Sequence, residues 1–262
     1  MSNFLYGEQL LVIGLPKGYD APKFMSASQA TRDQVWTFLP GLHGTDELYE
    51  KLRANLPAEQ ACEWVNLPAK GKQDYSYLSK WLDEELDNLE GTQRVLIAES
   101  FSGPLATRLA SLRPEEVSAV VLASSFCDAP LNPGIALLPL RPLFMVKPPR
   151  KALQHFLIGE ESNDDEVQEL RKIMRSISSS TLSRRVRAIL ELETEDSPQL
   201  KGLPMLILQA KDDNLIPWEA QQRLEARYPE ARVHWIDSPH MILQKHPAVC
   251  IENIIDFVEN FS

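Results

Sequence analysis

The stretch of this sequence that decides the fold reads Arg94-Val95-Leu96-Ile97-Ala98-Glu99-Ser100-Phe101-Ser102-Gly103-Pro104-Leu105. After Arg94 come three apolar residues of strand character, Val95, Leu96 and Ile97, and from Leu105 onward apolar residues recur at helical spacing. Between the two, Ser100 has a small residue two positions before it, Ala98, and another two positions after it, Ser102. Because a strand that turns sharply into a helix crowds the backbone, these flanking positions must be small. The stretch therefore predicts a tight turn that lifts the Ser100 side chain clear of a sheet.

The same spacing of small residues around a serine also occurs at Ser28, Ser125 and Ser178. Ser28 lies in a polar loop, and Ser178 lies in a serine run where a helix should end. Ser125 follows a good strand, but no helix pattern follows it before Pro130. Only Ser100 combines a strand before it, a helix after it and an additional glycine. Ser100 is therefore the candidate nucleophile, and a turn serine without chemistry is the alternative.

The length and composition favour one α/β domain of generous size, or a core with an inserted subdomain. Its three cysteines, Cys62, Cys127 and Cys250, are scattered and odd in number, which favours a reducing compartment over a disulfide framework. Their positions do not match metal-ligand spacing, and we expect neither a metal nor a cofactor. The formal net charge of −10 disfavours nucleic acid and anionic membrane surfaces as partners.

The first residues also bear on location. Residues 4–8 have no basic leader, and Glu8 interrupts their apolar run, so we expect no secretory signal. No uninterrupted apolar stretch is long enough to span a bilayer. These features predict a soluble, cytoplasmic protein without stable membrane insertion, and they leave its oligomeric state undecided.

Strand and helix patterns alternate along most of the chain, which predicts a mostly parallel sheet covered by helices on both faces. The predicted strands are residues 9–14, 33–39, 61–67, 95–97, 118–123, 204–209 and 231–236. The predicted helices run from Asp46, from Tyr75 to Leu89, from the Ser100 turn to Leu112, from Pro217 through Leu224, and from Pro247 onward.

The alternation stops in residues 127–202, where prolines interrupt an apolar stretch from Ile135 to Val146. This segment predicts an insertion rather than a second half of the sheet. We therefore divide the chain into a first part of the α/β core (1–126), a mainly helical insertion (127–202) and a second part of the core (203–262).

Two helices are predicted within the insertion. Asn163 and Glu166 form a capping-box pattern at the start of the first, and Ser180 or Thr181 is expected to cap the second. The apolar residues of each helix recur at the spacing of one face. The second helix carries three arginines, Arg184, Arg185 and Arg187. We interpret them as a solvated face, with a clamp for an anionic substrate as the alternative.

A serine is a poor nucleophile at neutral pH and needs a base, usually a histidine held in one tautomer by a carboxylate. After Ser100 the chain offers Asp212 or Asp213 just beyond one strand and His240 just beyond the next. All lie at the carboxyl ends of predicted strands, where open α/β sheets bind their ligands. The order Ser, Asp, His along the chain therefore predicts a triad.

Four segments together make the sequence resemble the α/β-hydrolase family over essentially the whole chain. Residues 39–45 resemble the family's oxyanion loop, and residues 98–103 resemble its nucleophile elbow. Residues 210–217 resemble its acid loop, in which the acid precedes x-x-Ile/Val-Pro. Residues 238–240, followed by Pro247, resemble its histidine loop.

The resemblance implies a role for each of these residues. Ser100 attacks, His240 acts as general base and then as general acid, and Asp213 orients His240, because only Asp213 has the x-x-Ile-Pro spacing. The resemblance also implies that the backbone N–H groups of Leu42 and Phe101 hold the oxyanion, and that the insertion is a lid over the active site.

The sequence departs from the family pattern at two places. Ala98 and Ser102 stand where the family most often has glycine, and the oxyanion loop reads Pro-Gly-Leu where many members read His-Gly-x. Both substitutions keep the crowded positions small. A serine nucleophile speaks against the haloalkane dehalogenase and epoxide hydrolase branches, which use aspartate.

Further residues are candidates for contact with a substrate. His43 follows the oxyanion loop and either contacts substrate or packs the loop. Glu99 either fills the position beside the turn or, as a buried carboxylate, tunes His240. Leu138 and Leu143 belong to the apolar part of the insertion, which covers the core or forms an acyl-chain pocket.

These residues predict a serine hydrolase that cleaves a carboxylic ester of a small or medium, largely apolar acyl compound through an acyl-enzyme. A thioesterase or small-amide hydrolase would use the same triad. The alternative from another class is an idle α/β-hydrolase scaffold used for binding. The expected partner is a small-molecule ester.

Overall fold

The computed structural model describes residues 34–87, 93–131, 134–135, 138–146 and 148–261. The strand predicted at residues 9–14 lies outside them. Within the described residues, a single sheet has all its strands parallel, in the order β2-β1-β3-β4-β5-β6. The strands are β1 (Val35–Leu39), β2 (Cys62–Trp64), β3 (Arg94–Glu99), β4 (Val117–Ala123), β5 (Met205–Ala210) and β6 (Arg232–Ile236). The predicted parallel α/β architecture is confirmed.

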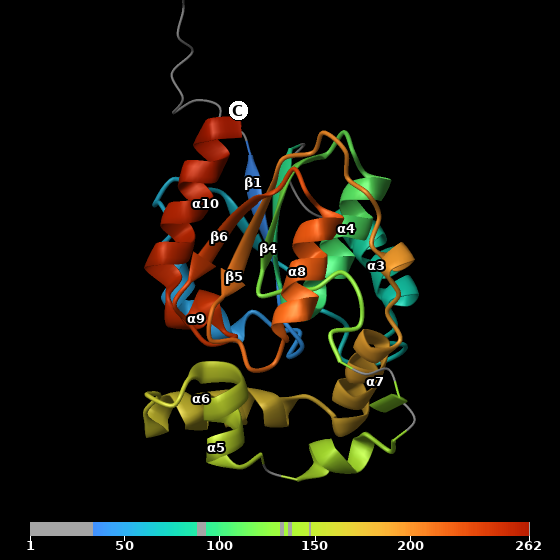
Figure 1. The fold of residues 1–262 in the computed structure, drawn as a ribbon, viewed down its shortest axis with the longest axis vertical. Coiled ribbons are helices and arrows are strands. Elements are labelled where there is room, and N and C mark those ends of the chain that lie inside the picture. Colours follow the sequence, from blue (N-terminus) through green and yellow to red (C-terminus); the bar gives the residue numbers. More distant parts are fainter. Residues whose placement is uncertain (1–33, 88–92, 132–133, 136–137, 147, 262) are drawn as a thin grey trace, which may run out of the picture.

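Helices cover both faces of the sheet (Figure 1). Along β3, Leu96 and Ala98 belong to one core cluster, whereas Val95 and Ile97 belong to the other, because successive side chains of a strand point to opposite faces. One face packs against α3 (Tyr75–Leu86), α4 (Gly103–Leu112) and α8 (Trp218–Arg227), and the other against α2 (Glu50–Arg53), α9 (Ile242–Lys245) and α10 (Pro247–Phe261).

The helix predicted from Asp46 begins as a 3-10 turn, η2 (Glu47–Tyr49), and continues as α2. The Asp46 side chain does not cap it and instead pairs with Arg53. None of the helices in the described part of the chain is long and apolar enough to cross a membrane.

We call the segment between β4 and β5, residues 127–202, the insertion. Its helical elements are η5 (Arg141–Met145), α5 (Arg150–Leu153), η6 (Gln154–Ile158), α6 (Asp164–Ser176), α7 (Ser179–Leu190) and η7 (Thr194–Asp196). The part of the chain that carries α5, α6 and α7 forms a layer of its own across one end of the sheet, and the chain after α7 returns beside α4 (Figure 1).

The predicted start of α6 is confirmed and that of α7 is not. The Asn163 side chain accepts a hydrogen bond from the Glu166 N–H (3.0 Å), and Glu166 accepts one from the Asn163 N–H (3.1 Å). For α7 the cap is Ser178, whose hydroxyl accepts from the Thr181 N–H (3.0 Å). The predicted caps, Ser180 and Thr181, lie inside the helix because the earlier serine already satisfies the third amide.

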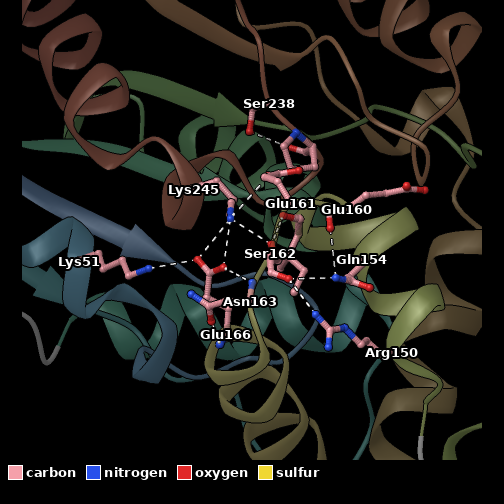
Figure 2. A network of polar contacts seen from close by, with 12 residues as sticks. Lys51, Arg150, Gln154, Glu160, Glu161, Ser162, Asn163, Glu166, Ser238 and Lys245 are labelled. Carbon is pink, nitrogen blue, oxygen red and sulfur yellow. Dashed lines mark hydrogen bonds and ion pairs between the residues drawn. The ribbon is translucent and has the colours of Figure 1, made fainter.

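Glu166 joins the insertion to the core (Figure 2). Its carboxylate lies between Lys51 of α2 (3.3 Å) and Lys245 of α9 (3.2 Å). Lys245 also donates to the Ser162 hydroxyl (3.0 Å). The paired residues line a cavity together with Met241 and Leu170, which belong to a small apolar cluster where Met241 packs against side chains of the insertion. The ion pairs of Glu166 and the apolar packing of Met241 therefore both hold this part of the insertion to the core.

Candidate active site

The turn at Ser100 has the conformation that its small neighbours predict. Ser100 adopts φ = 47°, a left-handed conformation that costs a non-glycine residue about 1–2 kcal/mol. The Ser102 hydroxyl donates to the Pro40 carbonyl, which ties the turn to the loop after β1. A Cβ on Gly103 would lie 1.8 Å from Ser125 Oγ, so that position has no room for a side chain. The chain therefore holds Ser100 in a strained turn at the end of β3.

Ser125, the competing serine, supports this turn. Its side chain is fully buried, and its hydroxyl donates a 2.8 Å hydrogen bond to the Ser100 carbonyl. Ser125 follows β4, the strand next to β3, which brings the two serines together. A hydroxyl that is committed to a backbone carbonyl is a structural group, and Ser100 remains the candidate nucleophile.

The structure brings Ser100, His240 and Asp213 together. Ser100 Oγ lies 3.0 Å from His240 Nε2, and His240 Nδ1 lies 2.8 Å from Asp213 Oδ2. The other oxygen, Asp213 Oδ1, accepts hydrogen bonds from the N–H groups of Leu215 (2.9 Å) and Ile216 (2.8 Å). These two bonds give the x-x-Ile-Pro spacing a physical role, because they fix the carboxylate that faces the histidine.

The neighbours of His240 set its charge. Burial lowers its pKa, but the negative charge and hydrogen bond of Asp213, together with the charge of Glu99, outweigh burial, and the pKa is raised from its ordinary value. The imidazole can therefore accept a proton from a serine and hold it beside a carboxylate. Asp212, the alternative acid, is exposed to solvent.

The two residues predicted to form the oxyanion hole lie close to Ser100 in different ways. Leu42 is half-buried and lines the same cavity as Ser100. Its loop is a tight turn in which the Gly44 N–H donates to the Gly41 carbonyl (2.9 Å). Phe101 follows Ser100 directly at the entry to α4. Their backbone N–H groups remain the proposed donors to an oxyanion.

Glu99 and His43 form a polar corner of the cavity. Glu99 is buried and accepts hydrogen bonds from the Tyr49 hydroxyl (2.5 Å) and from Gln244 Nε2 (3.2 Å). Burial lowers the pKa of His43 even though the charge of Glu99 opposes this, which favours a neutral imidazole. Its Nε2 atom is buried without a hydrogen-bond partner in the described structure. The sequence does not predict the roles of Tyr49 and Gln244. Each lies four residues after a motif segment, but each bonds to a side chain 50 or more residues away along the chain.

The cavity beside Ser100 has a volume of about 170 Å³ and walls that are mainly apolar. Leu138 and Leu143, predicted to line it, are not among its lining residues and are 57% and 69% exposed. Leu143 lies in η5, a 3-10 turn that has no buried residue. Leu138 lies before this turn, and between the two leucines it is Leu140 that is buried, against Leu190. The insertion lines the cavity with Leu170, Met174, Leu182, Val186, Ile189 and Leu190 of α6 and α7.

Arg185 corrects the interpretation of the arginines on α7. Arg184 and Arg187 are exposed, as predicted, whereas Arg185 is only 1% exposed. Its guanidinium donates to Gln73 Oε1 (2.8 Å), the Leu42 carbonyl (2.8 Å) and the Pro68 carbonyl (3.1 Å). The sequence held a signal for this, since Arg185 lies three residues after Leu182 and four before Ile189, on the apolar stripe of the helix.

Comparison with known proteins identifies the family of the chain. Residues 76–243 match the family model described as serine aminopeptidase, S33, which covers well over half of the chain. The chain belongs to this family of α/β-hydrolases. The resemblance predicted from the four loop segments is thus confirmed for the family and the fold.

Two relatives of this α/β-hydrolase carry the name pimeloyl-(acyl-carrier protein) methyl ester esterase. The protein from Aeromonas hydrophila is 28% identical over 206 residues, which are 74% of this chain and 80% of the relative. The protein from Aeromonas salmonicida is 24% identical over 235 residues, which are 83% and 92% of the two chains.

Solved structures share the fold at low sequence identity. An esterase from Exiguobacterium antarcticum superposes with a TM-score of 0.75 at 17% identity and covers 86% of this chain and 92% of its own. An enol-lactonase from Burkholderia xenovorans gives a TM-score of 0.71 at 13% identity over 86% and 91% of the two chains. At these identities the likeness concerns the fold alone.

Proposed function

We propose that this α/β-hydrolase cleaves carboxylic esters of small or medium apolar acyl groups, with Ser100 as nucleophile. The observation that carries the proposal is the 3.0 Å contact between Ser100 Oγ and His240 Nε2 at the wall of an apolar cavity. A nucleophile within hydrogen-bond reach of a base, with the base oriented by a carboxylate, is the arrangement that acyl transfer requires.

The proposed reaction has two halves. His240 Nε2 takes the Ser100 hydroxyl proton as Oγ bonds to the ester carbonyl carbon, and the N–H groups of Leu42 and Phe101 stabilise the oxyanion. The tetrahedral adduct then expels the alkoxide, which takes the proton from His240 and leaves as the alcohol. In the second half, a water molecule gives its proton to His240 and attacks the acyl carbon. Collapse releases the acid and returns the proton to Ser100.

The cavity supports an apolar acyl group. Its walls carry aliphatic side chains of α6 and α7, and its polar side chains gather near Ser100. Each buried methylene contributes about 0.8 kcal/mol before ordering costs. The names of the Aeromonas relatives also support an ester rather than a thioester or amide. We further propose that the insertion is a lid, because its helices complete the cavity.

An ester series would test the proposal. Wild-type protein should hydrolyse p-nitrophenyl esters with kcat/KM rising from acetate to medium chains and falling once the cavity is full. Ser100→Ala should lose several orders of magnitude in rate and all labelling by a fluorophosphonate. Ser111→Ala is the matched control, since Ser111 is exposed on α4. A wild-type protein that resists labelling would instead indicate an idle scaffold used for binding.

A further inference from the structure

Arg185 is a buried cation with neutral partners. The oxygens that it contacts are two backbone carbonyls and an amide oxygen, and it makes no ion pair with a carboxylate of the described residues. Burial lowers the pKa of its guanidinium to about 10, so the group stays charged at neutral pH. Because desolvating an unpaired charge opposes folding, a residue with only a packing role would be better served by an apolar side chain.

The contacts of Arg185 converge on the loop that carries Leu42. Nη1 donates to the Leu42 carbonyl, which belongs to the same residue whose N–H is the proposed oxyanion donor. Gly44, at the end of this loop, has φ = 76°, and a Cβ there would lie 2.0 Å from Nη1. The loop therefore has a glycine where the guanidinium approaches, and the arginine fixes the peptide on one side of Leu42.

The Nε side of the guanidinium is held by Gln73. Gln73 is buried, accepts from Arg185 Nε, and donates to the carbonyls of Pro68 (3.0 Å) and Lys70 (3.2 Å). The guanidinium carbon also lies 5.8 Å from the ring centroid of Phe101, the residue of the second proposed donor. Arg185 thus links a helix of the insertion to both segments proposed to bind the oxyanion.

We propose that Arg185 is a positioning residue for the oxyanion hole: it holds the Leu42–His43 peptide in place, which orients the neighbouring Leu42 N–H, and it puts a positive charge behind the site where negative charge develops. This inference rests on the proposed ester hydrolysis. A preorganised charge acts most strongly where water is excluded, and it stabilises the transition state more than the neutral ester. Arg185 should therefore affect the rate of acyl transfer far more than the binding of substrate.

The test compares Arg185→Met and Arg185→Lys with Arg187→Met, which changes an exposed arginine two residues along the same helix. The assays are kcat and KM on the best p-nitrophenyl ester, and Ki for a trifluoromethyl ketone of the same acyl chain, which forms an oxyanion adduct on the serine. We expect Arg185→Met to lower kcat by roughly tenfold to a hundredfold with little change in KM. The ketone Ki should rise by the factor lost from kcat/KM. Arg185→Lys should fall in between, and Arg187→Met should match wild type.

Two outcomes overturn the inference. One is a folded Arg185→Met protein with wild-type kcat and ketone Ki, and the other is a rise in KM alone, which would make Arg185 a substrate contact. If Arg185→Met does not fold, Arg185→Lys decides, because unchanged kcat and Ki in that variant also overturn the proposal. Failure of the proposed function has a different signature, since the wild-type protein would then hydrolyse no ester or Ser100→Ala would retain activity.

Discussion

The hydroxyl of Tyr49 donates a 2.5 Å hydrogen bond to Glu99, the carboxylate next to Ser100 in the chain. Burial raises the pKa of Tyr49 well above its ordinary value, and the charge of Glu99 raises it further, so the phenol keeps its proton. Tyr49 belongs to the core cluster on the side of the sheet where α2 and α10 pack, and Glu99 lines the cavity beside Ser100. The buried Glu99 carboxylate beside Ser100 thus has a neutral hydrogen-bond donor, Tyr49, as its partner.

Tyr49→Phe should destabilise the protein, because it removes a hydrogen bond from a buried carboxylate. The expected loss in the free energy of unfolding is roughly 1–3 kcal/mol, measured by urea denaturation at neutral pH. Tyr77→Phe is the control, since Tyr77 is 39% exposed. Equal midpoints for the two variants would show that Gln244 alone satisfies Glu99.

Asp213→Asn should lower kcat by roughly 10⁴-fold, because the amide no longer fixes the tautomer of His240. Asp212→Asn should keep kcat near the wild-type value, since Asp212 is exposed and, of the two aspartates, it is Asp213 that contacts His240. Steady-state kinetics on one p-nitrophenyl ester compares the two. Losses of similar size would move the role to another carboxylate.

The pH profile of kcat/KM should show one acidic limb set by His240. Protonated imidazole cannot take the serine proton, so activity falls as pH drops through the pKa of the free enzyme. Because Asp213 raises that pKa, the limb should lie above the ordinary histidine value. In Asp213→Asn the limb of the residual activity should move to lower pH. A limb that stays in place would assign the titration to a different group.

Glu166→Gln should loosen the insertion by removing its ion pairs with Lys51 and Lys245. Burial opposes ionisation of Glu166, but hydrogen bonds from Lys245 and the Asn163 backbone prevail and lower its pKa. A lowered carboxylate pKa gives stability that is present above the unfolded pKa and is lost as pH falls through the folded pKa. Limited proteolysis within residues 127–202 should therefore speed up in the variant at neutral pH, and in wild type only in acid or high salt. Glu169→Gln, an exposed change on α6, should cleave like wild type.

Met174→Trp should shift the preferred acyl chain to shorter lengths, because Met174 lines the cavity from α6. The kcat/KM values for the p-nitrophenyl ester series give the position of the optimum. Leu143→Trp, a change of similar size at an exposed site of the insertion, should leave the optimum unchanged. A shift in both variants, or in neither, would argue that the acyl chain binds elsewhere.

Sequence reasoning predicted the features that depend on local chemistry. The turn at Ser100 follows from small residues between a strand and a helix. The choice of Asp213 follows from resemblance to the family's acid loop, and its carboxylate accepts a hydrogen bond from the Ile216 N–H of that spacing. The start of α6 follows from a capping box of four consecutive residues, 163–166. Each of these patterns closes within a few residues, so the sequence alone contains all its partners.

The features that were missed depend on partners far along the chain. Arg185 contacts Leu42 and Gln73, which are more than a hundred residues away, and a charged residue on a helix is usually solvated. The apolar, proline-broken stretch with Leu138 and Leu143 suggests either a cover for the core or an acyl-chain pocket, whereas the apolar stripes of α6 and α7 supply the wall of the cavity. The cap of α7 differs, since the partner of Ser178 is only three residues away, but Ser178, Ser180 and Thr181 offer the same capping chemistry.

The contact between Arg185 and the loop at Leu42 sets a limit on engineering this enzyme. Residues 127–202 invite exchange for the corresponding segment of a related protein. They connect two neighbouring strands, β4 and β5, and they shape the cavity without supplying the nucleophile. A donor segment without an equivalent arginine would leave the Leu42 carbonyl and the Gln73 amide oxygen facing an empty space. A donor with the arginine would still need a glycine at position 44 of the recipient. Successful chimaeras should therefore combine an arginine from the donor segment with Gln73 and Gly44 of the recipient core.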